Sequence, residues 1–156
     1  MLRAWRVVKR KYLESAFDGE GARRAGGRWN SPGRPVIYTA ESSALAILEM
    51  LAHVELYLLS HYVFIPVRFP EEMSTRVDAA GLPGNWRSHP GPAALRRIGD
   101  RWLESGSSLA LQVPTAVAPT GWNHLLNPAH PDFSRLEIGN PIDFNMDARF
   151  LDLRPE

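Results

Sequence analysis

The sequence contains no cysteine, which excludes disulfide bonds, thiolate metal sites and cysteine nucleophiles. It also lacks any apolar run close to the roughly 20 residues that a membrane-spanning helix requires. Basic side chains interrupt the N-terminal stretch, so this stretch does not resemble the apolar core of a secretory signal. We therefore expect a cytoplasmic protein that has no membrane partner.

Sequence motifs of several common enzyme classes are also missing. The chain has neither GxGxxG nor GxxxxGK[ST], which argues against Rossmann and P-loop nucleotide binding. It has no GxSxG nucleophile elbow, and its five histidines show neither HExxH nor another compact ligand spacing. We therefore expect no metal site, and a nucleotide would have to be bound by a different set of residues.

The overall composition is that of an ordinary globular domain. The 156 residues are 44% hydrophobic and 22% charged, with a mean hydropathy of -0.25, which suits one domain spanning residues 1–156. The net charge of +1 hides an asymmetry: residues 1–34 hold nine basic and three acidic residues (+6), and the remainder holds nine and fourteen (-5). A localised positive region favours a small anionic ligand over a long nucleic-acid track.

The most informative stretch runs from Gly19 to Glu49 and reads GEGARRAGGRWNSPGRPVIYTAESSALAILE. Its glycines allow sharp turns and a close approach of the backbone to a ligand. Its arginines offer planar guanidinium groups that suit phosphate or carboxylate oxygens. These arginines are Arg23, Arg24, Arg28 and Arg34. The stretch therefore predicts a site for a phosphate-bearing small molecule.

The hydrophobic pattern predicts a mixed α+β domain without internal repeats. Strands are expected at residues 2–8, 35–39, 62–69, 109–113, 124–126, 136–138 and 150–153. A helix capped by Ser42 or Ser43 is expected to run to about Ser60 and to be largely buried, because apolar residues cover most of its circumference. A second helix, at residues 93–104, has one apolar face and is expected at the surface.

Proline marks two further features. Pro66 cannot donate to a strand ladder, so it places the 62–69 strand at a sheet edge or at a bulge. Residues 70–92 are rich in proline and glycine and are expected to be irregular. Because this segment also contains Leu82 and Trp86, we expect it to pack onto the domain as a covering loop.

Glu49 is the only formally charged residue between Ser42 and Val54, in the middle of the first predicted helix. A buried carboxylate is costly unless it is paired, hydrogen-bonded or protonated. One interpretation is a structural ion pair with an arginine such as Arg28. The other is a carboxylate that faces a ligand cleft.

Other polar residues allow similar pairs of interpretations. Arg28 in GGRW is either a solvated turn residue or a ligand contact, and Tyr38 is either a core aromatic or a ring that stacks on a planar ligand. Thr115 can reach a ligand ribose or bond to nearby backbone. The cluster Asn123, Asn127, His130 and Asp132 is typical of residues that tie loops together.

Several blocks of the sequence, in order, resemble the RES-domain family, the toxin half of bacterial toxin-antitoxin pairs. The blocks are GEGARRAGGRWNSPGRPVIYTA, LAILEMLAH, IGDRW, LQVPTAVAP, NHLLNPAHPDF and the closing DARF. The family is named after an Arg, a Glu and a Ser, and Arg28 and Glu49 match the first two. Thr115 stands where the family usually has the serine, and its extra methyl group restricts χ1 while it keeps the hydroxyl.

The resemblance implies an ADP-ribosyltransferase-like split mixed sheet with flanking helices, and an enzyme that breaks the nicotinamide-ribose bond of NAD. Water or inorganic phosphate would accept the ribosyl group, with no metal involved. Glu49 would stabilise the ribose, Tyr38 would position the nicotinamide ring and Arg28 would clamp the pyrophosphate. Catalysis is thus expected at Arg28, Tyr38, Glu49 and Thr115, and NAD binding at Arg28, Tyr38, Arg23, Arg24 and Asn127.

The resemblance further implies a cognate Xre-type helix-turn-helix antitoxin, so that DNA would be contacted only through that partner. Two alternative functions remain open at this point. The same cleft could transfer ADP-ribose to a protein or a nucleic acid. Alternatively, the chain could be a noncatalytic module that binds phosphate ligands or DNA, with Glu49 merely pairing with Arg28.

Overall fold

The computed structural model describes residues 1–151 and shows an α+β fold around one mixed sheet with the order β4-β5-β6-β2-β1-β3-β7, in which β8 also pairs with β3. Only β4 and β5 pair in parallel among the named strands. The strands are β1 (Leu2–Lys9), β2 (Ile37–Ala40), β3 (Tyr62–Phe69), β4 (Ser74–Arg76), β5 (Ala110–Pro114), β6 (Trp122–Leu126), β7 (Glu137–Ile138) and β8 (Ile142–Asp143). The helices are α1 (Glu20–Ala25), α2 (Ser43–Leu51), α3 (Ala93–Ser105) and α4 (Ala148–Leu151).

Short 3-10 turns link these elements, at Arg10–Ser15, Leu56–His61, Glu71–Met73, Ala79–Gly81 and Phe133–Arg135. Within the described range, no helix has the length and apolar character needed to cross a membrane.

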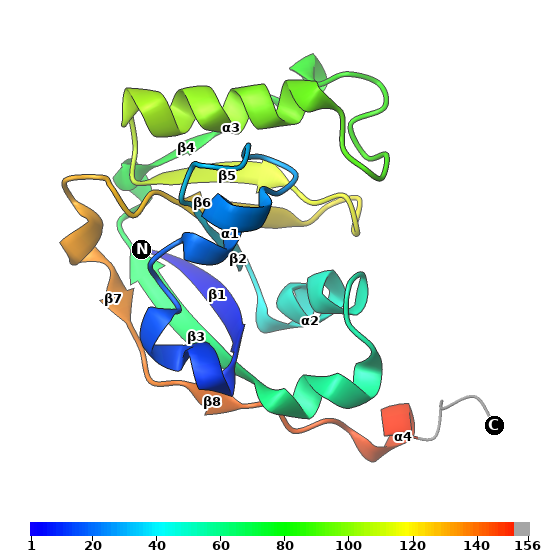
Figure 1. The fold of residues 1–156 in the computed structure, drawn as a ribbon. Coiled ribbons are helices and arrows are strands. Elements are labelled where there is room, and N and C mark those ends of the chain that lie inside the picture. Colours follow the sequence, from blue (N-terminus) through cyan, green and yellow to red (C-terminus); the bar gives the residue numbers. More distant parts are fainter. Residues whose placement is uncertain (152–156) are drawn as a thin grey trace.

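The sheet is split between β1 and β2. Strand β1 pairs with β3 along its full length, from Leu2 opposite Phe69 to Lys9 opposite Tyr62. It meets β2 at one register pair, Trp5 opposite Ala40. In Figure 1 the β1 and β3 strands therefore stand apart from β4, β5 and β6, which lie beneath α3. The expected α+β domain with a split mixed sheet and flanking helices is confirmed.

The two faces of the sheet pack against different parts of the chain, because successive side chains of a strand point to opposite faces. One face buries a cluster that includes Ala4, Ile37, Val67, Ala110 and Leu126. The other face, which we call the α2/α3 face, holds Trp5, Tyr38, Ala40, Val113, Asn123 and Leu125. Helix α2 packs against the Trp5 and Ala40 part of this face, and α3 packs against the Val113 and Leu125 part.

Helix α2 is shorter and less buried than the sequence predicts. Ser42 caps it as expected, because its Oγ accepts from the Leu45 amide at 3.1 Å. The helix ends at Leu51 instead of near Ser60, and a separate 3-10 turn follows at Leu56–His61. The apolar residues beyond Leu51 therefore belong to a second element, which explains why the pattern looked like one continuous helix. Leu51 is 39% exposed, which contradicts the expected burial.

Other differences are local. Helix α1 lies inside the Arg- and Gly-rich stretch, where the sequence did not predict a helix, and β4 lies inside the 70–92 segment, which was expected to be irregular. Phe150 is in α4 instead of a strand, because the Asp147 carboxylate accepts from the Arg149 amide at 2.9 Å and so caps a helical turn. Residues 152 and 153 of that predicted strand lie outside the described residues.

Pro66 lies neither on an edge strand nor at a bulge, because β3 pairs with β1 in an unbroken register on one side and with β7 and β8 on the other. Strand β7 pairs with Val67 and Arg68, whereas β8 pairs with Val63 and Phe64. The outer ladder of β3 is therefore interrupted around Pro66, where a proline nitrogen has no proton to donate.

Candidate active site

A hydrogen-bonded cluster forms around Glu49 where α2 meets the end of β5 and the start of β6. Thr115, directly after β5, donates its hydroxyl to Glu49 Oε1. Asn123 in β6 donates its side-chain amide to the same oxygen at 2.6 Å. Among the described residues, no hydrogen bond reaches Glu49 Oε2. The two donors thus fix the carboxylate by one oxygen and leave the other to a ligand.

The extra methyl group of Thr115 is accommodated because residue 121 is a glycine. Thr115 is 1% exposed, and a Cβ built at Gly121 would stand 2.7 Å from Thr115 Cγ2. The Thr115 amide donates to the Gly121 carbonyl at 3.1 Å, which closes the loop between β5 and β6. The hydroxyl therefore reaches the carboxylate even though the residue is not serine.

Tyr38 lies on the same face of the sheet as Asn123. Tyr38 and Ala40 are two residues apart in β2, and Ala40 is the cross-strand partner of Asn123. Tyr38 and Asn123 are therefore diagonal neighbours, a relation that places residues about 7–8 Å apart. This spacing brings the tyrosine and the Glu49 cluster within the span of one small ligand.

Hydrogen bonds lock the Tyr38 hydroxyl against the GGRW segment. It donates to Asn30 Oδ1 at 2.6 Å and accepts from the Trp29 amide at 3.1 Å. Residue 27 is required to be glycine, because a Cβ there would stand 2.6 Å from the Tyr38 hydroxyl oxygen. Burial raises the pKa of Tyr38 above its ordinary value, so the hydroxyl stays protonated.

Arg28 lies next to this lock but makes no ion pair with Glu49. Its Nη1 donates to the carbonyls of Trp86 and Ser88 at 3.0 and 2.9 Å. The structural Arg28–Glu49 ion pair considered from the sequence is therefore wrong, because Glu49 is held by neutral donors instead. Neither Nε nor Nη2 of Arg28 bonds to another of the described residues.

The segment before α3 covers this region, as the sequence predicts. Leu82 and Trp86 pack against the core cluster that contains Trp29. Arg87 donates from Nε and Nη2 to the Ala116 carbonyl at 3.2 and 3.0 Å, which ties the covering loop to the residue after Thr115. The loop thus spans from Arg28 to the Glu49 cluster.

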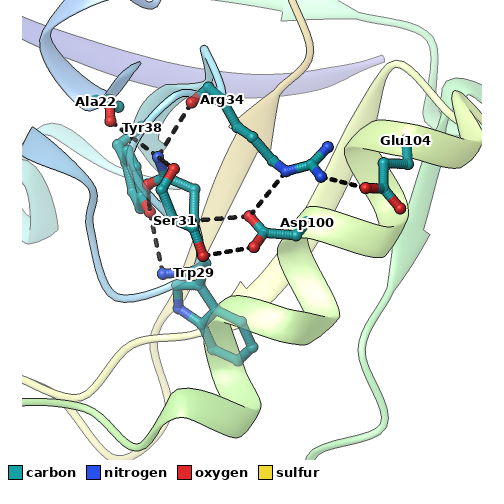
Figure 2. Close-up of polar contacts among 8 residues, drawn as sticks. Ala22, Trp29, Ser31, Arg34, Tyr38, Asp100 and Glu104 are labelled. Atoms are coloured by element: carbon teal, nitrogen blue, oxygen red, sulfur yellow. Dashed lines mark hydrogen bonds and ion pairs between the residues drawn. The ribbon is translucent and has the colours of Figure 1, made fainter. Parts of the chain in front are cut away.

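Arg34 binds α3 and does not contact the Glu49 cluster. Figure 2 shows its guanidinium between Asp100 and Glu104 of α3, with the Asp100 pair at 3.8 Å. Asp100 also accepts from the Ser31 amide and hydroxyl at 2.9 and 2.6 Å. These contacts hold the segment after Trp29 onto α3.

The other predicted ligand residues do not join the Glu49 cluster. Arg23 bonds to both carboxylate oxygens of Glu20 at 2.8 and 2.9 Å, and Arg24 lies 3.9 Å from the same carboxylate. Asn127 is buried and caps a turn, because its Oδ1 accepts from the Ala129 amide at 3.0 Å. It follows Asn123 by four residues along one extended segment, so it lies roughly 13 Å away at about 3.3 Å per residue.

Asn123 is the site residue that the sequence did not single out. It was interpreted as one of several loop-tying residues, but it lies in β6 and contacts Glu49. Its Oδ1 is buried and has no hydrogen-bond partner among the described residues, so its orientation depends on the bond to Glu49. Because Asn123 pairs with Ala40 across β2 and β6, its side chain lies on the face that carries Tyr38. The pattern of residues around Asn123 in the sequence does not reveal this cross-strand pairing.

Comparison with protein-family models matches residues 3–147 to the RES domain. A relative named Toxin Res from Yersinia enterocolitica is 42% identical over 147 residues, covering 93% of this chain and 97% of the relative. The Prs ADP-ribosylating toxin of Sphingobium sp. is 34% identical over 154 residues, covering 94% of this chain and 95% of the relative.

Among solved structures, the M. tuberculosis MbcT-MbcA toxin-antitoxin complex contains a chain of similar fold, with a TM-score of 0.69 and 21% identity. The match covers 98% of this chain and 88% of that chain. Such identity supports the fold alone, and it agrees with the split mixed sheet and flanking helices expected from the sequence. Because the family model and these relatives span nearly the whole sequence, the chain belongs to the RES-domain family.

Proposed function

We propose that this chain is the toxin of a toxin-antitoxin pair and acts by breaking the nicotinamide-ribose bond of NAD. The single observation that supports this most is the Glu49 carboxylate, held by Thr115 and Asn123 through one oxygen. Tyr38 lies on the same face of the sheet as Asn123, and the Arg28 guanidinium bonds to the covering loop. The names of the relatives from Yersinia enterocolitica and Sphingobium support the toxin role.

The chemistry suits a fixed carboxylate. When the bond between ribose C1′ and the nicotinamide nitrogen breaks, the electron pair leaves with the base, which becomes neutral, and positive charge develops on the ribose. A preorganised negative group beside that charge lowers the barrier. Glu49 Oε2 supplies this group, because Oε1 is already held by two donors.

The remaining residues orient the substrate. The Tyr38 ring positions the nicotinamide by stacking, and its hydroxyl is fixed by Asn30 and Trp29. Arg28 holds the pyrophosphate with Nε and Nη2 while Nη1 stays bonded to the covering loop. Arg23 and Arg24 are further candidates for phosphate contacts, for which each would exchange its contact with Glu20 for a phosphate oxygen.

The group that then attacks C1′ defines the reaction class. Water gives a glycohydrolase and inorganic phosphate gives a phosphorylase, with depletion of NAD arresting growth in either case. Transfer of ADP-ribose to a macromolecule is the second candidate, and the name of the Sphingobium relative favours it. The partner that restrains the enzyme is proposed to be an antitoxin of the Xre helix-turn-helix type, in line with the complex formed by the structural neighbour.

The direct test is to incubate the antitoxin-free protein with NAD and to measure free nicotinamide. We expect release that exceeds the uncatalysed rate, and dependence on added phosphate separates phosphorylase from glycohydrolase. Adenine-labelled NAD in the presence of a cell extract tests the second candidate, which predicts label on a macromolecule. If the folded protein releases no nicotinamide under any of these conditions, NAD cleavage is excluded.

The hydroxyl of Thr115 is expected to contribute more to the rate of nicotinamide release than its methyl group does. Replacing Thr115 by Val keeps the shape but removes one of the two donors to Glu49 Oε1. Because a hydrogen bond to a charged group is worth about 1.5–3 kcal/mol, we expect nicotinamide release to fall by about ten-fold or more. Thr115→Ser retains the donor and is the matched control, with activity close to that of the original chain. Equal activity of the two variants would contradict this role.

A further inference from the structure

A hollow opens on the α2/α3 face, over the half-sheet formed by β1, β3 and β7. It has a volume of about 370 Å³, within the range of small-molecule sites. Its lining consists of Arg3, Trp5, Pro66, Arg68, Glu137, Ile138 and Gly139. We call it the β1/β3 groove. None of its residues takes part in the Glu49 cluster.

The groove concentrates positive charge in an unusual way. Arg3 and Arg68 are direct cross-strand partners, and like charges at such positions destabilise a sheet. A single carboxylate is present, Glu137, which lies 3.6 Å from Arg68. Arg3 makes no ion pair with any of the described residues, and both arginines are exposed. An anion between the two guanidiniums would relieve this repulsion.

The rest of the lining is apolar and shaped by the strand pairing. Trp5 is half-buried, and Ile138 is 49% exposed. Residue 139 must be small, because a Cβ there would stand 2.8 Å from Pro66 Cγ. The Gly139 amide donates to the Pro66 carbonyl at 2.8 Å and so holds the segment after β7 over β3. The groove therefore combines an aromatic wall with two adjacent cations.

One row of cross-strand partners joins the strand positions at the candidate active site to those at the groove. The row consists of Asn123, Ala40, Trp5 and Pro66. Three strand spacings of about 4.8 Å separate its ends by roughly 14 Å. Helix α2 packs over the Trp5 and Ala40 part of this row, so the groove and the Glu49 cluster are separate sites.

We propose that the β1/β3 groove binds a phosphate-bearing small molecule, with Arg3 and Arg68 on the phosphate oxygens and Trp5 against the attached ring or sugar. Two sources share this chemistry: the diphosphate of the dinucleotide itself, which the groove would then hold in place of Arg28, and a separate phosphorylated co-substrate. Both sources rest on the proposed NAD chemistry, whereas binding of a phosphate to the groove does not.

The test measures binding of inorganic pyrophosphate and of ADP-ribose by calorimetry to the full chain and to its variants. The double variant Arg3→Gln, Arg68→Gln removes both guanidiniums at exposed positions and leaves the apolar wall. The matched control is Arg101→Gln, which removes an exposed arginine of α3 that makes no ion pair with any described residue. We expect the double variant to bind pyrophosphate at least about ten-fold more weakly and the control to bind it unchanged.

Competition between ADP-ribose and pyrophosphate then identifies which phosphate-bearing molecule the groove holds. If ADP-ribose displaces pyrophosphate, the groove holds the phosphates of the dinucleotide, and if both bind at once, it holds a separate co-substrate. Either result supports the site. Undetectable pyrophosphate binding, or equal affinities of the double variant and the original chain, would overturn it. Because no turnover is measured, a failure here is distinct from a failure to release nicotinamide.

Discussion

Replacing Glu49 by Gln is expected to lower nicotinamide release from NAD by about 10²–10³-fold, the size of effect seen when one preorganised electrostatic contact to a developing charge is removed. The change keeps the volume of the side chain. Thr115 and Asn123 both donate to Oε1, so they select the amide oxygen of the glutamine for that position. The amide nitrogen then occupies the place of Oε2, where a neutral donor faces the ribose instead of a negative charge.

The fold is expected to survive this replacement, because both hydrogen bonds to Oε1 are retained. Thermal unfolding of Glu49→Gln should therefore occur within a few degrees of that of the original chain. Glu41→Gln is the matched control, since the Glu41 carboxylate accepts from the Trp122 amide at 2.9 Å and is exposed. Full activity in Glu49→Gln would remove the proposed role, and a large loss of stability would favour a purely structural carboxylate.

Local sequence patterns predicted most of the regular elements. The 62–69 strand matches β3, and the 93–104 helix matches α3 to within one residue, because both have clear periodicity and clear boundaries. Periodicity failed at the end of α2, where no glycine or proline marks the stop and Leu56 continues the apolar pattern into a separate turn. It also failed for Phe150, although the aspartate at position 147 was a usable cap signal.

The sequence predicted most of the residues of the site, but it did not predict which of them contact one another. Glu49 and Thr115 come together across 66 positions of sequence, and Asn123 joins them from a neighbouring strand. Strand order and register decide such contacts, and neither follows from the local pattern around each residue. The same reason explains why Arg28 was considered as a partner for Glu49 although its Nη1 bonds to the covering loop.

Replacing Gly99 by Ala is expected to destabilise the protein by about 3 kcal/mol, at the upper end of overpacking effects. Gly99 lies in α3 where the helix crosses the GGRW segment, and a Cβ there would overlap the carbonyl oxygen of Trp29. That oxygen is a backbone atom and Trp29 is 2% exposed, so no side-chain rotation of Trp29 can remove the overlap. Either α3 or the GGRW segment has to move. Chemical denaturation, which gives the free energy of unfolding, measures the effect.

The same substitution also tests how α3 supports the site. The Trp29 amide donates to the Tyr38 hydroxyl, so displacing Trp29 from α3 shifts both the tyrosine and the neighbouring Arg28. We therefore expect Gly99→Ala to lower NAD cleavage even in the fraction that remains folded. Gly21→Ala is the control, because nothing lies within 4 Å of a Cβ there and alanine favours the helix α1 by about 0.5–1 kcal/mol. If both variants were equally stable, close contact between α3 and the GGRW segment could not be what positions Arg28 and Tyr38.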